Sequence, residues 1–133
     1  MIYTEEVRKK IENILKAFEN YIDNQNHFDI VCSTKVGYLW VVVDDLGSET
    51  PERLDTPENL LDNLFNDIIN DVVAPRESTS LMEECNLTEQ EATEVRHIAS
   101  TILNTIPEDA DGYLDYLNSY IKDYQKRCRE SME

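Results

Sequence analysis

The sequence is poor in the residues from which most familiar catalytic and cofactor motifs are built. It has three glycines and two histidines among 133 residues, and it contains no glycine-rich phosphate loop, no nucleophile elbow and no zinc signature. Its three cysteines, Cys32, Cys85 and Cys128, are far apart and odd in number, which argues against a disulfide framework and against a Cys-x-x-Cys metal site. Reduced thiols of this kind are typical of a cytoplasmic protein.

Long apolar runs and positive charge are also scarce. No run reaches the length of about 18 residues that a membrane span requires, and the first ten residues lack the apolar core of a secretory signal. Lysine and arginine number 12 against 28 acidic residues, a formal net charge of −16. Because phosphates would be repelled, we expect no direct binding to nucleic acid or to an anionic membrane. The cysteines and the lack of a signal core predict a cytoplasmic location.

The excess negative charge lies in the middle of the chain. Residues 44–115 contain 19 acidic and three basic residues, whereas the segments before and after them are almost neutral. Such a surface attracts a basic protein partner by electrostatic steering. Solubility alone is the simpler explanation for the same charge.

Amphipathic helices are predicted from the spacing of the apolar residues. The clearest helix runs from Thr56 to Pro75, with Thr56 as its N-cap and Pro57 at its first position. Its apolar doublets recur every four residues, so the apolar face drifts, broadens and predicts contact with more than one neighbour. The other helices are expected over residues 4–26, 80–85 and 88–105, and from Asp109 or Asp111 to about Glu130.

A β-hairpin is predicted over residues 28–43. Apolar and polar residues alternate from Phe28, and Gly37 can adopt the positive φ of a tight turn. The second strand is apolar on both faces and needs cover on both sides, while no clear third strand follows, although Leu54 would fit a short one. The expected fold class is α+β, a helix-dominated single domain over residues 1–133 in the order α-β-β-α-(short α)-α-α.

Two short patterns have the spacing of metal sites and simpler explanations. Glu94 and His97 have the Glu-x-x-His spacing of di-iron bundles, but there is no second such pair. At about 100° per residue they lie opposite the core face of their helix. The segment from Asp109 to Gly112 hints at a calcium loop without its terminal Glu, and helix capping explains its acids better. We expect no metal ion.

Two further groups of residues suggest catalysis only weakly. Cys32 lies near His27 in the sequence, as a thiol nucleophile and a base would, yet its alternation with Phe28 and Ile30 favours a small buried residue. The Asp and Asn residues along the central helix are better explained as its hydrated outer face. We expect no catalytic residues and no cofactor.

The tyrosines of the last helix are the strongest candidates for a binding surface. Tyrosine is amphipathic and enriched at interfaces, although tyrosines at this spacing would equally seal the edge of a core, and the same two explanations apply to Tyr38 and Trp40. Carboxylates of the central helix would add negative charge to the surface. The predicted partner-binding residues are Tyr113, Tyr116, Tyr120, Tyr124, Asp62, Asp67 and Asp71.

These features favour a small acidic cytoplasmic module that docks on a basic protein and has no catalytic activity. In this respect it would act like an inhibitor or an adaptor. A sharper variant is nucleic-acid mimicry, in which carboxylates take the place of phosphates. One alternative is a homo-oligomeric domain in which the strand Leu39–Val43 pairs across a two-fold axis. The other is an enzyme of a type that the sequence does not reveal.

Overall fold

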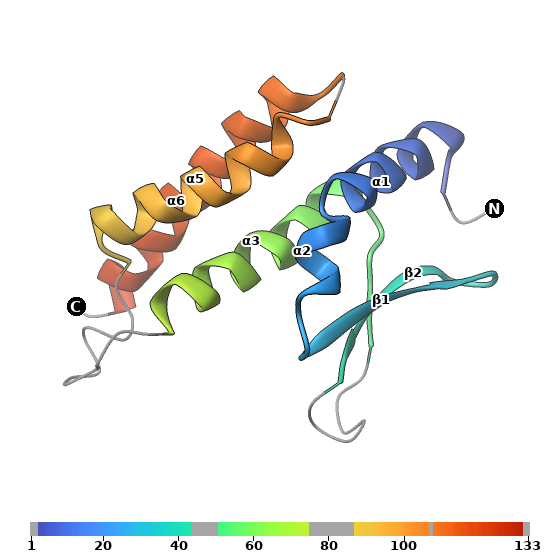
Figure 1. Cartoon of the computed structure of the whole chain (residues 1–133), viewed down its shortest axis with the longest axis horizontal. Coiled ribbons are helices and arrows are strands. Elements are labelled where there is room, and N and C mark those ends of the chain that lie inside the picture. The colour runs from blue at the N-terminus through green and yellow to red at the C-terminus, as the bar shows by residue number, and fades with distance from the viewer. Residues whose placement is uncertain (1–2, 44–50, 75–86, 107, 132–133) are drawn as a thin grey trace. The chain divides into compact units, whose positions relative to one another are not determined.

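The computed structural model describes residues 3–43, 51–74, 87–106 and 108–131, with side chains described to residue 127 (Figure 1). The chain divides into two compact units, Met1–Leu61 and Asp62–Glu133, here called the first and the second unit. The first unit contains α1 (Glu5–Ala17), α2 (Glu19–Asp23), β1 (Phe28–Ser33), β2 (Gly37–Val42) and β3 (Glu52–Arg53). Helix α3 (Pro57–Val73) runs from the first unit into the second, which also contains α5 (Glu89–Leu103) and α6 (Ala110–Ser131).

The helix-dominated α+β class is therefore confirmed. The expectation of a single domain over 1–133 stays a prediction. The short helix expected over residues 80–85 lies outside the described residues. Among the described residues, no helix combines the length and the apolar character needed to cross a bilayer.

The first helix of the prediction is divided in two. Thr4 caps α1, because its hydroxyl accepts a hydrogen bond from the Val7 amide at 3.1 Å. The helix is interrupted at Phe18, whose φ of −90° and ψ of 6° leave the helical region. Phe18 is completely buried, and α2 then ends at Asp23, three residues before the predicted end.

The strands form an antiparallel sheet in the order β1-β2-β3. The hairpin prediction is confirmed, with Phe28 opposite Val42 at one end and Ser33 opposite Gly37 at the turn. The strand β3, which the sequence indicated only through Leu54, is two residues long and pairs with the middle of β2. It makes β2 the central strand of the described sheet, which relieves the marginal stability of an isolated hairpin.

A tyrosine hydroxyl completes the ladder between β2 and the end of β3. The Tyr3 hydroxyl accepts a hydrogen bond from the Tyr38 amide at 2.9 Å and donates one to the Leu54 carbonyl at 2.6 Å. The Leu54 amide donates directly to the Tyr38 carbonyl at 2.9 Å. Residues that face each other in this way in an antiparallel sheet normally form two direct backbone hydrogen bonds with each other. The phenol oxygen therefore replaces one of them.

Gly37 makes this close approach of Tyr3 feasible. Its φ is +85°, a conformation that other residues rarely adopt, and a Cβ at this position would lie 2.5 Å from the Tyr3 hydroxyl oxygen. The turn glycine that the sequence identified thus has a second role, which is to leave room for a residue 34 positions earlier in the chain.

The predicted N-cap of α3 is confirmed, and α5 is capped as well. At α3, the Asn59 amide donates to the Thr56 hydroxyl at 3.0 Å. At α5, Thr88 and Glu91 form a complete capping box, with distances of 3.1 and 3.0 Å. Local hydrogen bonds of this kind are determined by residues within one helical turn, which is why the sequence alone identifies them.

Helix α3 has the broad buried face that its four-residue repeat predicts. The buried arc is wider than expected, because Asp67 is only 5% exposed. The expectation of a hydrated outer face is therefore wrong at this position. A helix covered on more than one side leaves a narrow solvent-exposed strip. The apolar residues of α3 with no exposed surface are Leu60, Leu61, Leu64, Phe65, Ile68 and Ile69.

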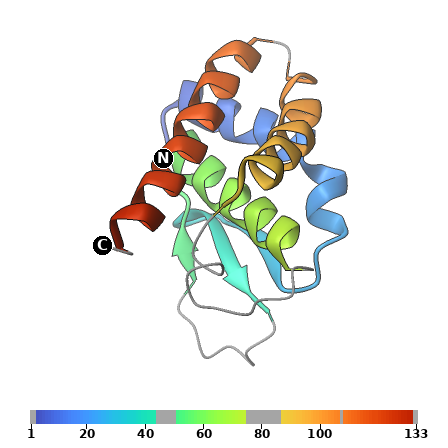
Figure 2. The same cartoon turned by 90° about the vertical axis from the view of Figure 1, so that its left-hand side faces the viewer.

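Helices α5 and α6 lie side by side and antiparallel in both views (Figure 1, Figure 2). Two polar contacts join them. The Arg96 guanidinium donates to the Asn118 side chain at 3.1 Å, and the Gln125 amide group donates to the Glu89 carboxylate at 3.1 Å. The last two helices of the chain therefore form an antiparallel pair.

Candidate functional site

The second unit brings together three of the predicted partner-binding residues. Asp62 of α3 and Tyr116 and Tyr120 of α6 line an open depression of about 500 Å³. The Tyr116 hydroxyl donates a hydrogen bond of 2.6 Å to the Asp62 carboxylate. The Tyr120 ring meets Phe65 edge-on, with the ring centroids 5.7 Å apart. We call this the tyrosine depression, and its lining residues are Asp62, Tyr116, Tyr120, Asp123, Lys126 and Arg127.

The tyrosine depression carries both signs of charge. Asp62 and Asp123 supply carboxylates, and the C-terminal part of α6 supplies Lys126 and Arg127. Cations near the C-terminal end of a helix also complement its dipole. In the structure, the guanidinium of Arg127 lies 5.9 Å from the ring centroid of Tyr124, within the range of a cation–π contact.

The pKa of the Tyr120 phenol is raised by its surroundings. Burial raises its pKa above the ordinary value of 10.0, and the nearby negative charge of Asp62 raises it further, while Arg127 acts in the opposite direction. Burial disfavours the charged phenolate. Tyr120 therefore stays protonated at neutral pH and can donate or accept a hydrogen bond at the edge of the depression.

The other predicted partner-binding residues do not line the depression. Tyr113 is 8% exposed and Asp67 is 5% exposed, so both offer very little surface in this conformation. Tyr124 is half-buried and Asp71 is exposed. A role for these four residues in partner binding stays a prediction.

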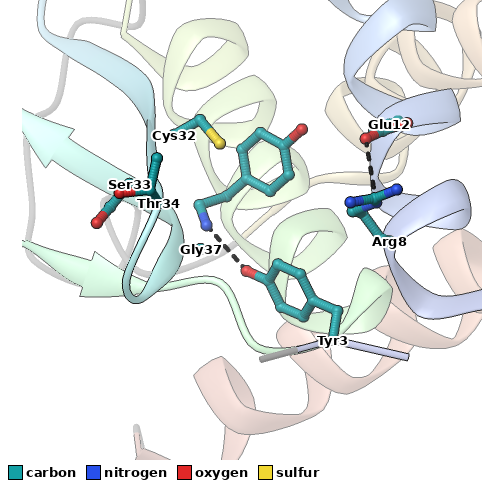
Figure 3. Close-up of a pocket in the computed structure, with 8 residues that line it drawn as sticks. Tyr3, Arg8, Glu12, Cys32, Ser33, Thr34 and Gly37 are labelled. Atoms are coloured by element: carbon teal, nitrogen blue, oxygen red, sulfur yellow. Dashed lines mark hydrogen bonds and ion pairs between the residues drawn. The ribbon is translucent and has the colours of Figure 1, made fainter. Parts of the chain in front are cut away.

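A second concave site lies in the first unit, between α1 and the end of the hairpin (Figure 3). It is a pocket of about 240 Å³, here called the α1–hairpin pocket. Two tyrosine rings form one wall, with centroids 6.2 Å apart and planes inclined by 21°. On the α1 side, the Arg8 guanidinium lies 3.7 Å from the Glu12 carboxylate. The lining residues are Tyr3, Arg8, Glu12, Cys32, Ser33, Thr34, Gly37 and Tyr38.

Cys32 lines this pocket as an exposed free thiol. The expectation of a small buried residue is wrong here. Alternation along β1 places Phe28 inside, at 3% exposed, but the strand becomes exposed toward the turn. The burial of a strand residue depends on what covers that point of the sheet, and the alternation by itself does not specify the cover.

The phenol of Tyr38 has a raised pKa. Its burial is the main cause, and negative charge at Cys32 and Glu12 adds to the effect, whereas Arg8 lowers the pKa. The pocket thus holds a phenol that keeps its proton at neutral pH beside a thiol and an ion pair. These residues come from two segments that are far apart in the chain, 3–12 and 32–38, so sequence spacing does not group them, and the turn glycine was the one available signal.

The pair with Glu-x-x-His spacing lies on the exposed side of α5. Glu94 and His97 are both exposed, as the helical geometry predicted. Within the described residues, no three His, Cys, Asp or Glu side chains are grouped so that they could hold a metal ion.

Comparison with known proteins adds nothing to these two sites. No family model matches the chain, and no curated protein and no solved structure is significantly similar to it. No family is shown. What the chain can bind therefore follows from its own residues and their geometry.

Proposed function

We propose that this chain is a small non-catalytic protein-binding module of the cytoplasm, which docks on a basic partner through the tyrosine depression. The observation that carries the proposal is the hydrogen bond of 2.6 Å from Tyr116 to Asp62. It holds one half-buried tyrosine in place beside a second, Tyr120, whose ring rests against Phe65. Tyrosines that are already held lose little conformational entropy when a partner covers them, and such residues often dominate binding energy.

The charge of the second unit supports a basic partner. Residues 62–133 contain 16 acidic and six basic residues, a net charge of −10. A surface with this excess accelerates the encounter with a positively charged protein and disfavours acidic ones. The exposed carboxylates of its described helices include Asp71, Glu94, Asp111, Asp115 and Asp123.

The contact of Arg127 with Tyr124 supports a specific mode of recognition. A guanidinium group already rests on this flank of α6, 5.9 Å from an aromatic centroid. An arginine of the partner would find the faces of Tyr116 and Tyr120 and the carboxylates of Asp62 and Asp123 in the adjoining depression. Aromatic faces and carboxylates together bind guanidinium groups through cation–π contacts and charge-assisted hydrogen bonds.

The exposed thiol in the first unit supports a location in a reducing compartment. Cys32 is a free thiol on the surface. Exposed thiols persist in the cytoplasm and are oxidised or paired in secreted proteins. The proposed location is therefore the cytoplasm.

The first test is affinity capture of the partner from host lysate at low and at high salt, followed by mass spectrometry. We expect a basic protein that is retained at low salt and released at high salt, because exposed charges are screened over about 10 Å at 0.1 M salt. An empty bait at low salt, or retention that salt does not change, would contradict the proposal. Release of the captured partner by added DNA would favour the nucleic-acid mimic over a simple adaptor.

Two matched charge reversals distinguish binding through the depression from attraction by the net charge of the chain. Asp123→Lys changes an exposed residue of the depression, and Glu94→Lys makes the same change in charge at an exposed position of α5 outside it. With the captured partner, Asp123→Lys should weaken binding at least about tenfold, because it places a cation in the depression that the partner contacts. Glu94→Lys should weaken binding less than about threefold, because it acts only at long range, where salt screens charge over about 10 Å at 0.1 M. Equal losses would indicate that net charge alone attracts the partner.

Self-association is the second candidate function, and exposed apolar residues of the first unit favour it. Val31 is 44% exposed and Val43 is 52% exposed. The predicted pairing strand Leu39–Val43 belongs mostly to the central strand β2, where Leu39 and Trp40 already pair with β3. Self-association would therefore use the outer edge of β1. A monomer in light scattering at high protein concentration would exclude this candidate.

A further inference from the structure

We propose that the α1–hairpin pocket binds a small, uncharged, planar aromatic compound that carries a hydrogen-bond acceptor. The pocket belongs wholly to the first unit and shares no residue with the tyrosine depression. The inference goes beyond the proposed function and does not depend on it. The residues that carry the argument are Tyr3, Arg8, Glu12, Cys32 and Tyr38.

The size and walls of the pocket favour a single flat ring system. Its volume of about 240 Å³ is below the range of roughly 300–1,000 Å³ that is typical of sites for drug-sized ligands. The rings of Tyr3 and Tyr38 are nearly parallel, with an angle of 21° between their planes. A planar aromatic ligand can stack on such a wall, and aromatic pairs gain energy beyond the area that they bury.

The charges at the rim favour an uncharged ligand. Figure 3 shows Arg8 and Glu12 together on the α1 side of the pocket. The Nε atom of Arg8 lies 3.7 Å from Oε1 of Glu12. An anion would be attracted by Arg8 and repelled by Glu12, and a cation would meet the reverse. A charged ligand would thus lose its hydration without gaining an unopposed counter-charge, whereas a neutral ligand avoids this cost.

The polar groups favour an acceptor on the ligand. A phenol is protonated at neutral pH, and burial raises the pKa of Tyr38 further, so its hydroxyl can donate a hydrogen bond to a carbonyl group. The Tyr3 hydroxyl is already engaged with the Tyr38 amide and the Leu54 carbonyl. The exposed thiol of Cys32 contributes a polarizable sulfur, which forms favourable contacts with aromatic rings.

Three probes of the same shape test the charge preference. Benzamide, benzoate and benzamidine differ in net charge and little in size, and their dissociation constants for the full chain can be measured by ligand-observed NMR titration. We expect benzamide to bind at least fivefold more tightly than either charged probe. Preference for benzoate would assign the pocket to anions held by Arg8, and preference for benzamidine would assign it to cations held by Glu12. Either preference, or no binding of benzamide, overturns the proposal.

Neighbouring residues of β1 provide a matched pair of variants that locates the probe. Cys32→Phe places a ring in the pocket, while Val31→Phe adds a similar ring at the adjacent exposed position, which points to the opposite face of the sheet. Benzamide affinity should fall at least tenfold in Cys32→Phe and less than twofold in Val31→Phe. Equal losses in the two variants, or none in Cys32→Phe, would place the probe elsewhere and overturn the proposal.

The unmodified chain supplies an independent readout that does not rely on the folding of a variant. Cys32 is exposed and lines the pocket, so bound benzamide should slow its alkylation by iodoacetamide at least threefold, as followed by peptide mass spectrometry. Unchanged alkylation of Cys32 at saturating benzamide would contradict the proposal. Tyr38→Phe should weaken benzamide binding about three- to tenfold, the range for one lost hydrogen bond.

Discussion

Removal of the Tyr3 hydroxyl tests whether this group holds β2 to the end of β3. The phenol oxygen connects the Tyr38 amide to the Leu54 carbonyl at 2.9 and 2.6 Å. Tyr3→Phe deletes this oxygen and keeps the ring that stacks on Tyr38. The variant therefore removes two hydrogen bonds with little change in packing.

The expected loss of stability follows from the two backbone groups that remain. A buried polar group left without its hydrogen bond costs about 1–3 kcal/mol, and Leu54 is completely buried. If the segment that contains Leu54 shifts toward β2, a direct backbone bond replaces part of the loss. We therefore expect the free energy of unfolding to fall by about 2 kcal/mol.

This loss converts into a melting temperature through the entropy of unfolding. At about 2.1 cal/mol/K per residue, cooperative unfolding of 133 residues lowers the melting temperature by about 3.6 °C per kcal/mol, or about 7 °C in total. If residues 1–61 unfold on their own, the same loss lowers their transition by about 15 °C. The size of the shift thus also reports whether the two units unfold together.

The assay is thermal and urea unfolding followed by circular dichroism, with Tyr38→Phe as the matched control. That substitution removes a phenolic oxygen from the same stacked pair of rings and leaves the backbone amide of residue 38 in place. We expect the control to change the unfolding free energy by less than about 0.5 kcal/mol. A Tyr3→Phe variant as stable as the unmodified chain, or a control that costs as much, would refute the bridging role.

Three further predictions address the turn, the phenol of the depression and a helix cap. Gly37→Ala should destabilise the chain more than Tyr3→Phe does in urea unfolding, because the new Cβ would meet the Tyr3 ring. The loss of stability caused by Gly37→Ala should be smaller when Tyr3 is already replaced by Ala, and an equal loss in both backgrounds would contradict this. The raised pKa of Tyr120 makes the folded chain hold its phenol proton more tightly than the unfolded chain, so the resulting stability is present below pH 10.0 and lost as pH rises through the folded pKa. Urea midpoints between about pH 8 and about pH 11 should therefore fall less steeply in Tyr120→Phe, and an unchanged slope would argue against this burial effect. Thr88→Ala should cost about 1 kcal/mol in the same assay by breaking the capping box with Glu91, while Thr88→Ser should retain most of the stability.

The sequence by itself determined the elements whose hydrogen bonds are local. The caps at Thr4, Thr56 and Thr88 join groups three residues apart, so the residue types at those positions specify them. The same holds for the hairpin, whose turn residue Gly37 adopts φ of +85°. The fold class, the hairpin and the positions of the long helices follow from such short-range patterns and from the periodicity of the apolar residues.

The tertiary structure decided which residues are exposed and which distant residues meet. Asp67 belongs to a polar series along α3 and is nevertheless buried, and Cys32 belongs to an alternating strand and is exposed. The pairing of Tyr116 with Asp62 spans 54 positions, and that of Tyr3 with Leu54 spans 51. Periodicity gives the face on which a side chain lies, but the element that covers this face comes from a remote part of the chain. Both candidate sites are made of such contacts, and for this reason only the folded chain revealed them.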